Sequence, residues 1–177
     1  MAMGIQAALD LAVRAHADQW REGDSPLPYV THPIEVMTNL RYVGLVTDEE
    51  MLCAALLHDT VEETSVTLPD IAKTFGPRVG ALVKELTRRE PSPAQIEGMT
   101  KGEIWSLRSD MLLKEISKMS PDAQQIKLAD RLSNLRDAYR TKQGEKLVRY
   151  GKQSSRILKI VPRERNPGLW DAIRALL

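Results

Sequence analysis

Apolar residues recur at helical spacing from the start of the chain. A helix over residues 5–20 would be apolar along one face, at Ile5, Ala8, Leu11, Ala12 and Ala15, and polar on the other. Strand-like alternation of β-branched residues is hard to find along the chain. The pattern therefore predicts an all-α fold with an aliphatic core and argues against a β-sandwich or a β-barrel.

Capping residues and prolines mark where further helices begin. Thr47 with Glu50 forms a capping box, which predicts a helix that runs through His58 to about Glu63. Thr67 is the next predicted cap. The remaining predicted helices cover residues 33–42, 68–75, 78–87, 103–119, 156–161 and 168–177, the last capped by Asn166, together with one that starts at Pro121 and carries IKLADRLSNLRD.

Glycine and proline gather in two stretches that predict loops. Residues 21–31 and 88–102 contain several of them, and the helical periodicity stops in both. No repeat, low-complexity tract or domain boundary interrupts the chain. Because 177 residues is near the middle of the single-domain range, the sequence predicts one helical-bundle domain over residues 1–177.

The composition is that of a globular protein with nearly balanced charge. Hydrophobic residues make up 42% of the chain and charged residues 28%, with a formal net charge of +1. A net charge this small removes the general attraction to phosphate backbones on which nucleic-acid-binding proteins rely. We therefore expect a small-molecule partner in a local pocket and no nucleic acid.

The cysteine count and the hydropathy pattern bear on location. Cys53 is the single cysteine, so it has no partner for an internal disulfide. No segment approaches the roughly 18 consecutive apolar residues that a membrane-spanning helix needs. Asp10 interrupts the N-terminal segment where a secretory signal would be apolar. We expect a cytoplasmic protein that makes no membrane contact.

Acidic and imidazole side chains concentrate in three places along the chain. These are His32 at a loop-to-helix junction, the cluster His58, Asp59, Glu62 and Glu63, and the pair Asp130 and Asn134. Residues four apart share a helix face, so the expected aligned pairs are His58 with Glu62, Asp59 with Glu63, and Asp130 with Asn134. Two imidazoles with carboxylates suit a divalent metal such as Mn, Fe or Zn, and the lack of thiolates argues against a closed structural zinc site.

The same residues also have interpretations that need no metal. Asp130 could pair with Arg131 or Lys127, and Glu62 and Glu63 could form a solvated helix end. An adjacent His–Asp pair is a weak signal by itself, because a histidine on an apolar helix is more often a hydrogen-bonded core residue. Burying several acids is costly, however, unless a ligand or a partner compensates their charge.

Four strings occur in an order and spacing typical of a known family. They are AHADQWREGDSPLPYVTHP, AALLHDTVEET, FGPRVGALVKELT and IKLADRLSNLRD. With them the chain resembles the hydrolase domain of RelA/SpoT-type stringent-response proteins, in the HD phosphohydrolase superfamily, and in particular the stand-alone small alarmone hydrolases. The resemblance implies an all-α HD-type bundle and a metal-dependent enzyme that removes pyrophosphate from the 3′ position of guanosine tetra- or pentaphosphate, leaving GDP or GTP.

The resemblance also implies which residues form the catalytic site. The family's four metal ligands, which usually bind Mn²⁺, correspond to His32, His58, Asp59 and Asp130. The family's acidic pair, which lies beside the metal and its water, corresponds to Glu62 and Glu63. Glu62 is the first candidate for the carboxylate that takes the proton from the attacking water, with Glu63 helping to position the water or the leaving group.

Three further residues match the family's nucleotide site. Asn134 matches a residue that lines it, Arg21 matches a basic residue that packs against the nucleotide, and Tyr29 lies in the family's Pro-Tyr-x-x-His-Pro stretch. Surface charge and a core aromatic are the alternative roles for Arg21 and Tyr29. His16 also matches the family, but we expect it to pack between helices rather than to bind a ligand.

Two departures from the family pattern leave other functions open. Glu63 stands where the family usually has Asp, and Glu22 stands where it tends to have Lys or Arg. Glu22 reverses a charge near the expected phosphate site, so phosphatase activity on another nucleotide, such as an adenosine alarmone or NADPH, is one alternative. A nucleotide-binding sensor without turnover and a purely structural helical protein are two more. The sequence predicts no particular oligomeric state.

Overall fold

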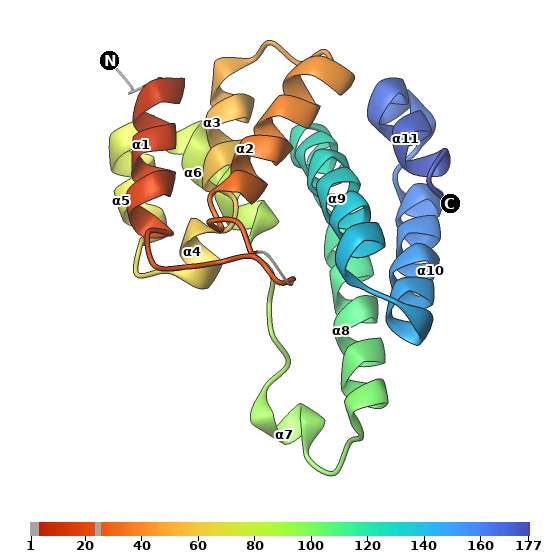
Figure 1. Cartoon of the computed structure of the whole chain (residues 1–177). Coiled ribbons are helices and arrows are strands. Elements are labelled where there is room, and N and C mark those ends of the chain that lie inside the picture. The colour runs from red at the N-terminus through yellow and green to blue at the C-terminus, as the bar shows by residue number, and fades with distance from the viewer. Residues whose placement is uncertain (1–3, 24–25) are drawn as a thin grey trace.

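Helices form the regular structure of the protein. The computed structural model describes residues 4–23 and 26–177, and within these ranges the only strand-like pairing is an isolated bridge between Trp20 and Pro28. The predicted all-α fold is therefore confirmed (Figure 1). Asp24 and Ser25, which belong to the predicted loop over residues 21–31, lie outside the described residues, as do the first three residues.

The helices vary widely in length. In chain order they are α1 (Ile5–Ala15), α2 (Thr31–Thr38), the π-helical turn η1 (Asn39–Val43), α3 (Glu49–Leu57), α4 (Thr60–Glu63), α5 (Leu68–Phe75), α6 (Pro77–Leu86), α7 (Pro93–Ile96), α8 (Lys101–Ile116), α9 (Pro121–Thr141), α10 (Gly144–Ile160), the 3₁₀ turn η2 (Arg163–Arg165) and α11 (Pro167–Arg174). No helix within the described residues is both long enough and apolar enough to cross a membrane.

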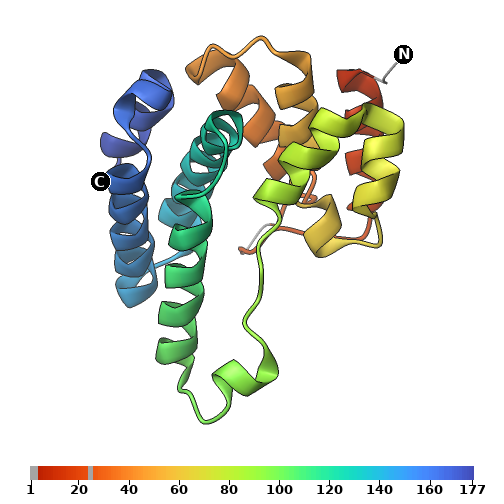
Figure 2. The same cartoon turned by 180° about the vertical axis from the view of Figure 1, so that it is seen from behind.

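Helix α9 is the centre of the bundle. It packs against α2, α3 and α6 on one side and against α10 and α11 on the other (Figures 1 and 2). Leu128, Leu132 and Leu135 on this helix are completely buried, and each such side chain contributes roughly 1.5–3 kcal/mol through its transfer from water. Polar residues on α9 that are not in the apolar core are therefore held in fixed positions against α2 and α3.

The segment between α6 and α8 projects from the bundle and carries α7 at its tip (Figure 2). The sequence predicts a loop over residues 88–102, and this is correct except for the single turn of α7, which a capping box of Ser92 and Gln95 begins. Helix α8 then returns beside α10. Residues of α8, α9 and α10 and Arg88 of the projecting segment line one pocket.

Side-chain caps fix the starts of several helices as the sequence predicts. Thr67 accepts a hydrogen bond from the backbone of Asp70 and caps α5, and Asn166 caps α11. The capping box predicted at Thr47 is wrong by one residue: Asp48 is the cap, and its carboxylate accepts a hydrogen bond from the backbone N–H of Met51 at 3.0 Å. An aspartate satisfies the free N–H groups at the start of α3 as well as a threonine would, so local pattern alone does not distinguish the two.

The prediction of one continuous helix over residues 47–63 is wrong near its C-terminal end, where His58 and Asp59 lie. Helix α3 stops before His58, and α4 begins only at Thr60, whose hydroxyl donates to the carbonyl of Leu57 at 2.7 Å. His58 and Asp59 therefore lie at a junction between two helices. Asp59 and Glu63 still lie one helical turn apart, because the backbone N–H of Glu63 donates to the carbonyl of Asp59 at 2.9 Å.

Two other boundaries differ from the predictions. The first helix ends at Ala15 rather than at residue 20. Helix α10 covers residues 144–160, whereas the sequence predicts a helix only over residues 156–161. The buried residues of α10 are Ser154, Ile157 and Leu158, all in its second half, so the part of the helix that packs into the core overlaps the predicted one.

Candidate metal centre and its pocket

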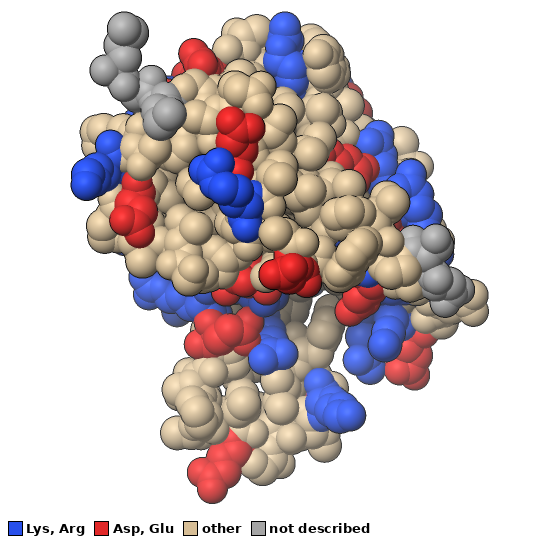
Figure 3. Space-filling model, turned by 60° about the vertical axis from the view of Figure 1, so that its left-hand side comes forward, with Lys and Arg blue, Asp and Glu red and all other residues tan. Residues whose placement is uncertain are grey.

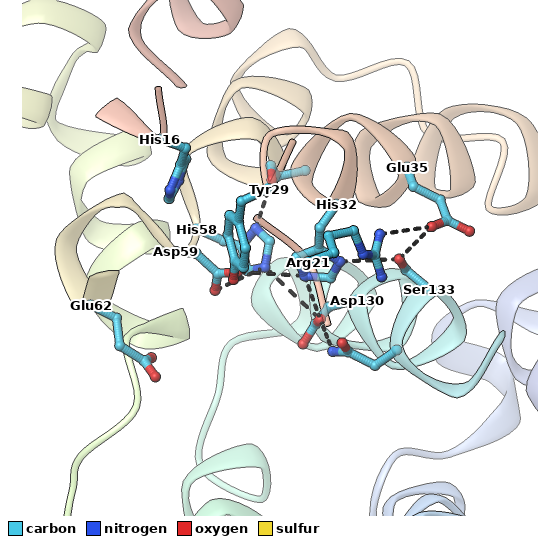
Figure 4. Close-up of polar contacts among 12 residues, drawn as sticks. His16, Arg21, Tyr29, His32, Glu35, His58, Asp59, Glu62, Asp130 and Ser133 are labelled. Atoms are coloured by element: carbon cyan, nitrogen blue, oxygen red, sulfur yellow. Dashed lines mark hydrogen bonds and ion pairs between the residues drawn. The ribbon is translucent and has the colours of Figure 1, made fainter. Parts of the chain in front are cut away.

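Two histidines and two aspartates from separate elements converge beside the middle of α9. His32 comes from α2, His58 and Asp59 from the α3–α4 junction, and Asp130 from α9 (Figure 4). The Nε2 atom of His32 lies 3.4 Å from Asp59 Oδ2 and 3.4 Å from Asp130 Oδ1. The Nε2 atom of His58 lies 3.1 Å from Asp59 Oδ1 and 3.9 Å from Asp130 Oδ1. Both imidazoles therefore direct Nε2 toward carboxylate oxygens.

The donor atoms of this cluster suit a divalent cation. One atom each from His32, His58 and Asp59 lies within 4.8 Å of the others, and the Asp130 oxygen lies beside both imidazoles. The Nδ1 atom of His58 hydrogen-bonds to the carbonyl oxygen of Ala55 at 2.9 Å, so it carries the proton of the neutral ring. The opposite nitrogen, Nε2, is buried and makes no hydrogen bond within residues 4–23 and 26–177, although Asp59 is near. A buried lone pair facing two carboxylates is the arrangement that a metal ion completes.

The electrostatics of the cluster favour binding of a cation. Burial lowers the pKa of His58, but the carboxylates of Asp59 and Asp130 outweigh this effect and raise that pKa to about 9. Burial raises the pKa of both aspartates, but neighbouring side chains outweigh it and hold their pKa values well below the usual range: the two imidazoles for Asp59, and Lys127 with the imidazoles for Asp130. Asp59 and Asp130 are therefore ionised. Their negative charge favours a positive charge beside them, either a proton on an imidazole or a metal ion bound between the four side chains.

We expect metal binding to tighten as the pH rises toward about 9. Without metal, the pKa of His58 is about 9, so below this pH an incoming ion must displace a proton from the imidazole. The apparent Kd for Mn²⁺ should then fall by about tenfold per pH unit where one proton is displaced. Isothermal titration calorimetry in buffers of different ionisation enthalpy counts the displaced protons, and a pH-independent Kd would contradict the expectation.

The acidic pair lies in the wall of the same pocket, one turn beyond the cluster. Glu62 accepts a hydrogen bond from the backbone N–H of Arg88 at 3.1 Å and pairs with the Arg88 guanidinium at 2.9 Å. Burial raises the pKa of Glu62, and Arg88 opposes the change only in part. Glu63 also lines the pocket, while its backbone carbonyl accepts a hydrogen bond from Gln19 at 2.7 Å. A carboxylate with a raised pKa beside a candidate metal centre is suited to proton transfer.

The pocket itself is polar and rich in cationic side chains. It has a volume of about 340 Å³ and opens beside the projecting segment, where Figure 3 shows acidic and basic side chains around a hollow. Besides His32, Asp59 and Asp130 of the cluster and the acidic pair, its walls contain Tyr29, Arg88, Trp105, Arg108, Lys127, Arg131, Asn134 and Tyr150. Cations and aromatic rings beside a metal centre are the groups that bind phosphates and nucleobases.

Arg131 is the most unusual cation of the pocket because it is buried, at 5% exposed. Its guanidinium donates to Gln153 Oε1 at 2.5 Å and lies 5.8 Å from the ring centre of Tyr150. Among the described residues, no carboxylate lies within ion-pair distance of it, and burial lowers its pKa. A buried guanidinium without a carboxylate partner at the wall of a pocket is suited to an anionic ligand.

Two of the three expected nucleotide contacts lie in this pocket. Asn134 donates a hydrogen bond to Asp130 Oδ1, which confirms that the two share a face of α9. Tyr29 donates its hydroxyl proton to Asp59 Oδ2 at 2.7 Å, so its polar atom holds a candidate metal ligand in place. Burial and Asp59 both raise the pKa of Tyr29, and the hydroxyl therefore stays protonated.

Arg21, the third expected contact, faces a different cavity. It pairs with Glu35 at 3.5 Å and Asp137 at 3.2 Å, and it lines a neighbouring pocket of about 430 Å³. Glu22 lines that pocket too, but its side chain is 83% exposed and pairs with Lys142 at 2.8 Å. The charge of Glu22 is therefore matched by a cation and lies outside the pocket of the candidate metal centre.

Local sequence patterns do not identify several residues of the pocket. From the sequence, Lys127 is expected only as an alternative partner of Asp130. This ion pair does form, at 2.8 Å through Asp130 Oδ2. The other oxygen of Asp130 still faces the imidazoles, so the pair is compatible with metal binding. Arg88, Trp105 and Arg108 come from the predicted loop and the helix after it, and no local pattern connects them to the histidines.

His16 packs as expected. Its ring is buried, with its centre 4.8 Å from that of Tyr29, and its Nδ1 atom hydrogen-bonds to Gln19 Oε1 at 2.7 Å. His16 therefore supports Tyr29 from behind and lies outside the group of converging donor atoms.

Known proteins share much of this sequence. The guanosine-3′,5′-bis(diphosphate) 3′-pyrophosphohydrolase MESH1 of Homo sapiens is 38% identical over 143 residues, which cover 78% of this chain and 74% of that protein. MESH1 of Drosophila melanogaster is 40% identical over 129 residues, which cover 73% of this chain and 66% of that protein. A probable GTP pyrophosphokinase of Mycobacterium leprae is 38% identical over 136 residues, which are 75% of this chain but 15% of that much longer protein.

Solved structures share the fold. The structure of a metazoan orthologue of SpoT that hydrolyses ppGpp superposes with a TM-score of 0.82 at 32% identity, covering 97% of this chain and 92% of that one. The Listeria monocytogenes protein lmo0812 superposes with a TM-score of 0.60 at 24% identity, a likeness of fold alone. The HD domain family model matches residues 8–159. With its paired histidines and aspartates at the centre of that region, the chain belongs to the HD domain family, as its sequence motifs imply.

Proposed function

We propose that this protein is a metal-dependent hydrolase that removes pyrophosphate from the 3′ position of guanosine tetra- or pentaphosphate and leaves GDP or GTP. The observation that carries the proposal is the convergence of His32, His58, Asp59 and Asp130, three of which, His32, Asp59 and Asp130, line a pocket with cationic walls. The MESH1 relatives, named as hydrolases of this nucleotide, support the choice of substrate. The whole chain, residues 1–177, would act as one domain in the cytoplasm, with no nucleic-acid partner.

His32, His58, Asp59 and Asp130 would hold the metal ion, and we propose Mn²⁺. A mixed set of nitrogen and oxygen donors suits Mn²⁺, as it does Fe and Zn. When bound, the ion would supply Lewis-acid chemistry, lowering the pKa of water and offsetting negative charge that develops on the phosphoryl oxygens. The aspartates also fix the charge of the site, since both stay ionised.

Glu62 would take the proton from the water that attacks phosphorus. Its raised pKa makes it a stronger base than an exposed glutamate, and its contacts with Arg88 hold the carboxylate at the pocket wall. Glu63 would help to position the water or the leaving pyrophosphate. It is one methylene longer than the aspartate of the family pattern, and it still lines the pocket.

The cations of the pocket would bind the phosphates. Arg131 is buried without a carboxylate partner among the described residues, whereas Arg88 and Arg108 share carboxylates at the mouth of the pocket. Asn134 would contribute its side-chain amide to the nucleotide site. Tyr29 would act through its hydrogen bond to Asp59, which keeps that carboxylate in place. Arg21 stays a proposed nucleotide contact, reached from the neighbouring cavity.

Replacing Arg131 should weaken substrate binding more than it slows the chemical step. A hydrogen bond to a charged group contributes about 1.5–3 kcal/mol, so Arg131→Gln should raise KM by about 10- to 100-fold. Arg131→Lys keeps the charge and should give an intermediate value. Arg156→Gln is the control, because Arg156 of α10 pairs with Asp110 of α8 at the exposed surface. An unchanged KM in Arg131→Gln would exclude this residue from phosphate binding.

A product assay with several nucleotides tests the function directly. Purified protein with Mn²⁺ is incubated with guanosine tetraphosphate, guanosine pentaphosphate, an adenosine alarmone or NADPH, and products are separated by anion-exchange chromatography. We expect GDP or GTP with equimolar pyrophosphate from the guanosine substrates. Faster phosphate release from NADPH or the adenosine nucleotide would favour the phosphatase alternative, and tight binding without any product would favour a sensor.

A further inference from the structure

A chain of hydrogen bonds leads away from His32 on the side opposite the candidate metal centre. The Nδ1 atom of His32 lies 3.1 Å from Ser133 Oγ, and Ser133 donates to Glu35 Oε2 at 2.8 Å. Glu35 in turn pairs with Arg21 (Figure 4), and Arg21 also pairs with Asp137. The chain is built of side chains throughout and crosses between α2 and α9.

Helical spacing explains why the chain forms at this place. Glu35 lies three residues after His32 on α2, and Ser133 lies three residues after Asp130 on α9, so each helix presents a metal ligand and a supporting residue on one face. The two helices pack directly against each other. Ser133 is completely buried at their crossing, which leaves its hydroxyl no water as an alternative partner.

The direction of each hydrogen bond follows from the proton count. Glu35 pairs with a guanidinium and, as a carboxylate, only accepts. Ser133 has one hydroxyl proton, which it gives to Glu35, so its oxygen must accept from His32 Nδ1. His32 therefore carries its proton on Nδ1 and leaves the Nε2 lone pair facing Asp59 and Asp130, each at 3.4 Å.

The two histidines differ in how this tautomer is fixed. A backbone carbonyl, that of Ala55, holds His58, and its position follows from the end of α3. Only side chains hold His32. We infer that Ser133 and Glu35 are positioning residues that keep His32 in the Nδ1-protonated tautomer with Nε2 directed at the metal. The inference rests on the proposed metal-dependent function, and it assigns a role to two residues outside the ligand set.

A matched pair of variants at Glu35 separates the hydrogen-bond acceptor from the ion pair with Arg21. Glu35→Gln and Glu35→Met both remove the negative charge, but only Gln keeps an oxygen that accepts from Ser133. Ser133→Ala removes the hydroxyl itself. Ser154→Ala is the control for losing a buried serine, since Ser154 is equally buried and donates to the carbonyl of Tyr150 on α10.

Two measurements test the positioning role of Ser133 and Glu35 without relying on turnover. Imidazole nitrogen NMR shifts of the metal-free protein at alkaline pH report the tautomer of His32, and calorimetry reports the Kd for Mn²⁺. Removing an outer partner of a metal ligand weakens binding by about 10- to 100-fold, so we expect this loss in Ser133→Ala and Glu35→Met. In both variants the NMR shifts of His32 should show a mixture of tautomers, and kcat should fall while KM changes little. Glu35→Gln and Ser154→Ala should stay close to the original protein in tautomer and Kd.

The outcomes distinguish this inference from the proposed function. A single Nδ1-protonated tautomer and an unchanged Kd in Ser133→Ala would overturn the inference and leave the hydrolase proposal intact. Equal losses in Glu35→Gln and Glu35→Met would also overturn it, because the charge rather than the hydrogen bond would then matter. An original protein that binds metal but hydrolyses no nucleotide would overturn the proposed function, while the tautomer and Kd measurements would still test the inference.

Discussion

Asp59→Asn should abolish metal binding and turnover together. Asp59 is within 3.4 Å of both imidazoles, and its negative charge is the largest attraction that raises the pKa of His58. An amide keeps the volume and can still accept from Tyr29, so the fold should be retained. A metal ion contributes several kcal/mol to the transition state, so its loss should lower kcat/KM by roughly 10³-fold or more. Elemental analysis after dialysis and a nucleotide assay measure the two effects.

The control for this variant is Asp110→Asn. Asp110 pairs with Arg156 at the surface, and its side chain is far more exposed than that of Asp59. It should keep both metal and activity. Full metal occupancy in Asp59→Asn would remove Asp59 from the ligand set, and circular dichroism melting of both variants would show that a loss of metal is not a loss of fold.

The parts of the site that the sequence predicts are those that local spacing determines. Asp130 and Asn134 share a face of α9 because they are four residues apart on a continuous helix. For His32 the prediction is close: Pro33 predicts a helix start, but α2 begins two residues earlier, at Thr31, so His32 lies in its first turn. Where an element is regular, its period is enough to say which side chains project together.

The break at the α3–α4 junction is not visible in the sequence. Every residue of α3 from Met51 to Leu57 is buried, so its apolar run has no polar face whose phase would reveal where the helix ends. The break is decided by tertiary contacts: Asp59 accepts from Tyr29, a residue 30 positions earlier, and lies beside His32 of another helix. The local pattern predicts a helix through Asp59 because it does not contain these contacts.

Arg131 illustrates a second limit. In the sequence it is the neighbour of Asp130 and suggests an ion pair, but adjacent residues on a helix point in different directions. The structure directs Asp130 toward His32 and Lys127, and Arg131 toward Gln153 on α10. The residues that α10 brings there, Tyr150 and Gln153, are partly polar and are not among its fully buried residues, so the apolar pattern of this helix does not point to them.

Glu62→Gln should slow the chemical step without releasing the metal. Glu62 is outside the converging group of donor atoms, and its raised pKa suits it to accept a proton. Removing a general base lowers kcat by about 10²-fold or more. Glutamine keeps an oxygen that can accept from the Arg88 backbone, so the pocket wall should stay in place. Calorimetry should give a Kd for Mn²⁺ within about twofold of the original.

The pH profile identifies the role of Glu62 more specifically than the rate does. A base must be deprotonated to act, so kcat should fall as the pH drops through the pKa of Glu62, which burial raises above that of an exposed glutamate. In Glu62→Gln this acid limb should disappear from the residual activity. Glu90→Gln is the matched control, because Glu90 also pairs with Arg88, at 3.0 Å, but is exposed at the mouth of the pocket. Should Glu62→Gln keep near-normal turnover with an unchanged acid limb, the base would have to be another carboxylate, and Glu63→Gln would be the next variant to measure.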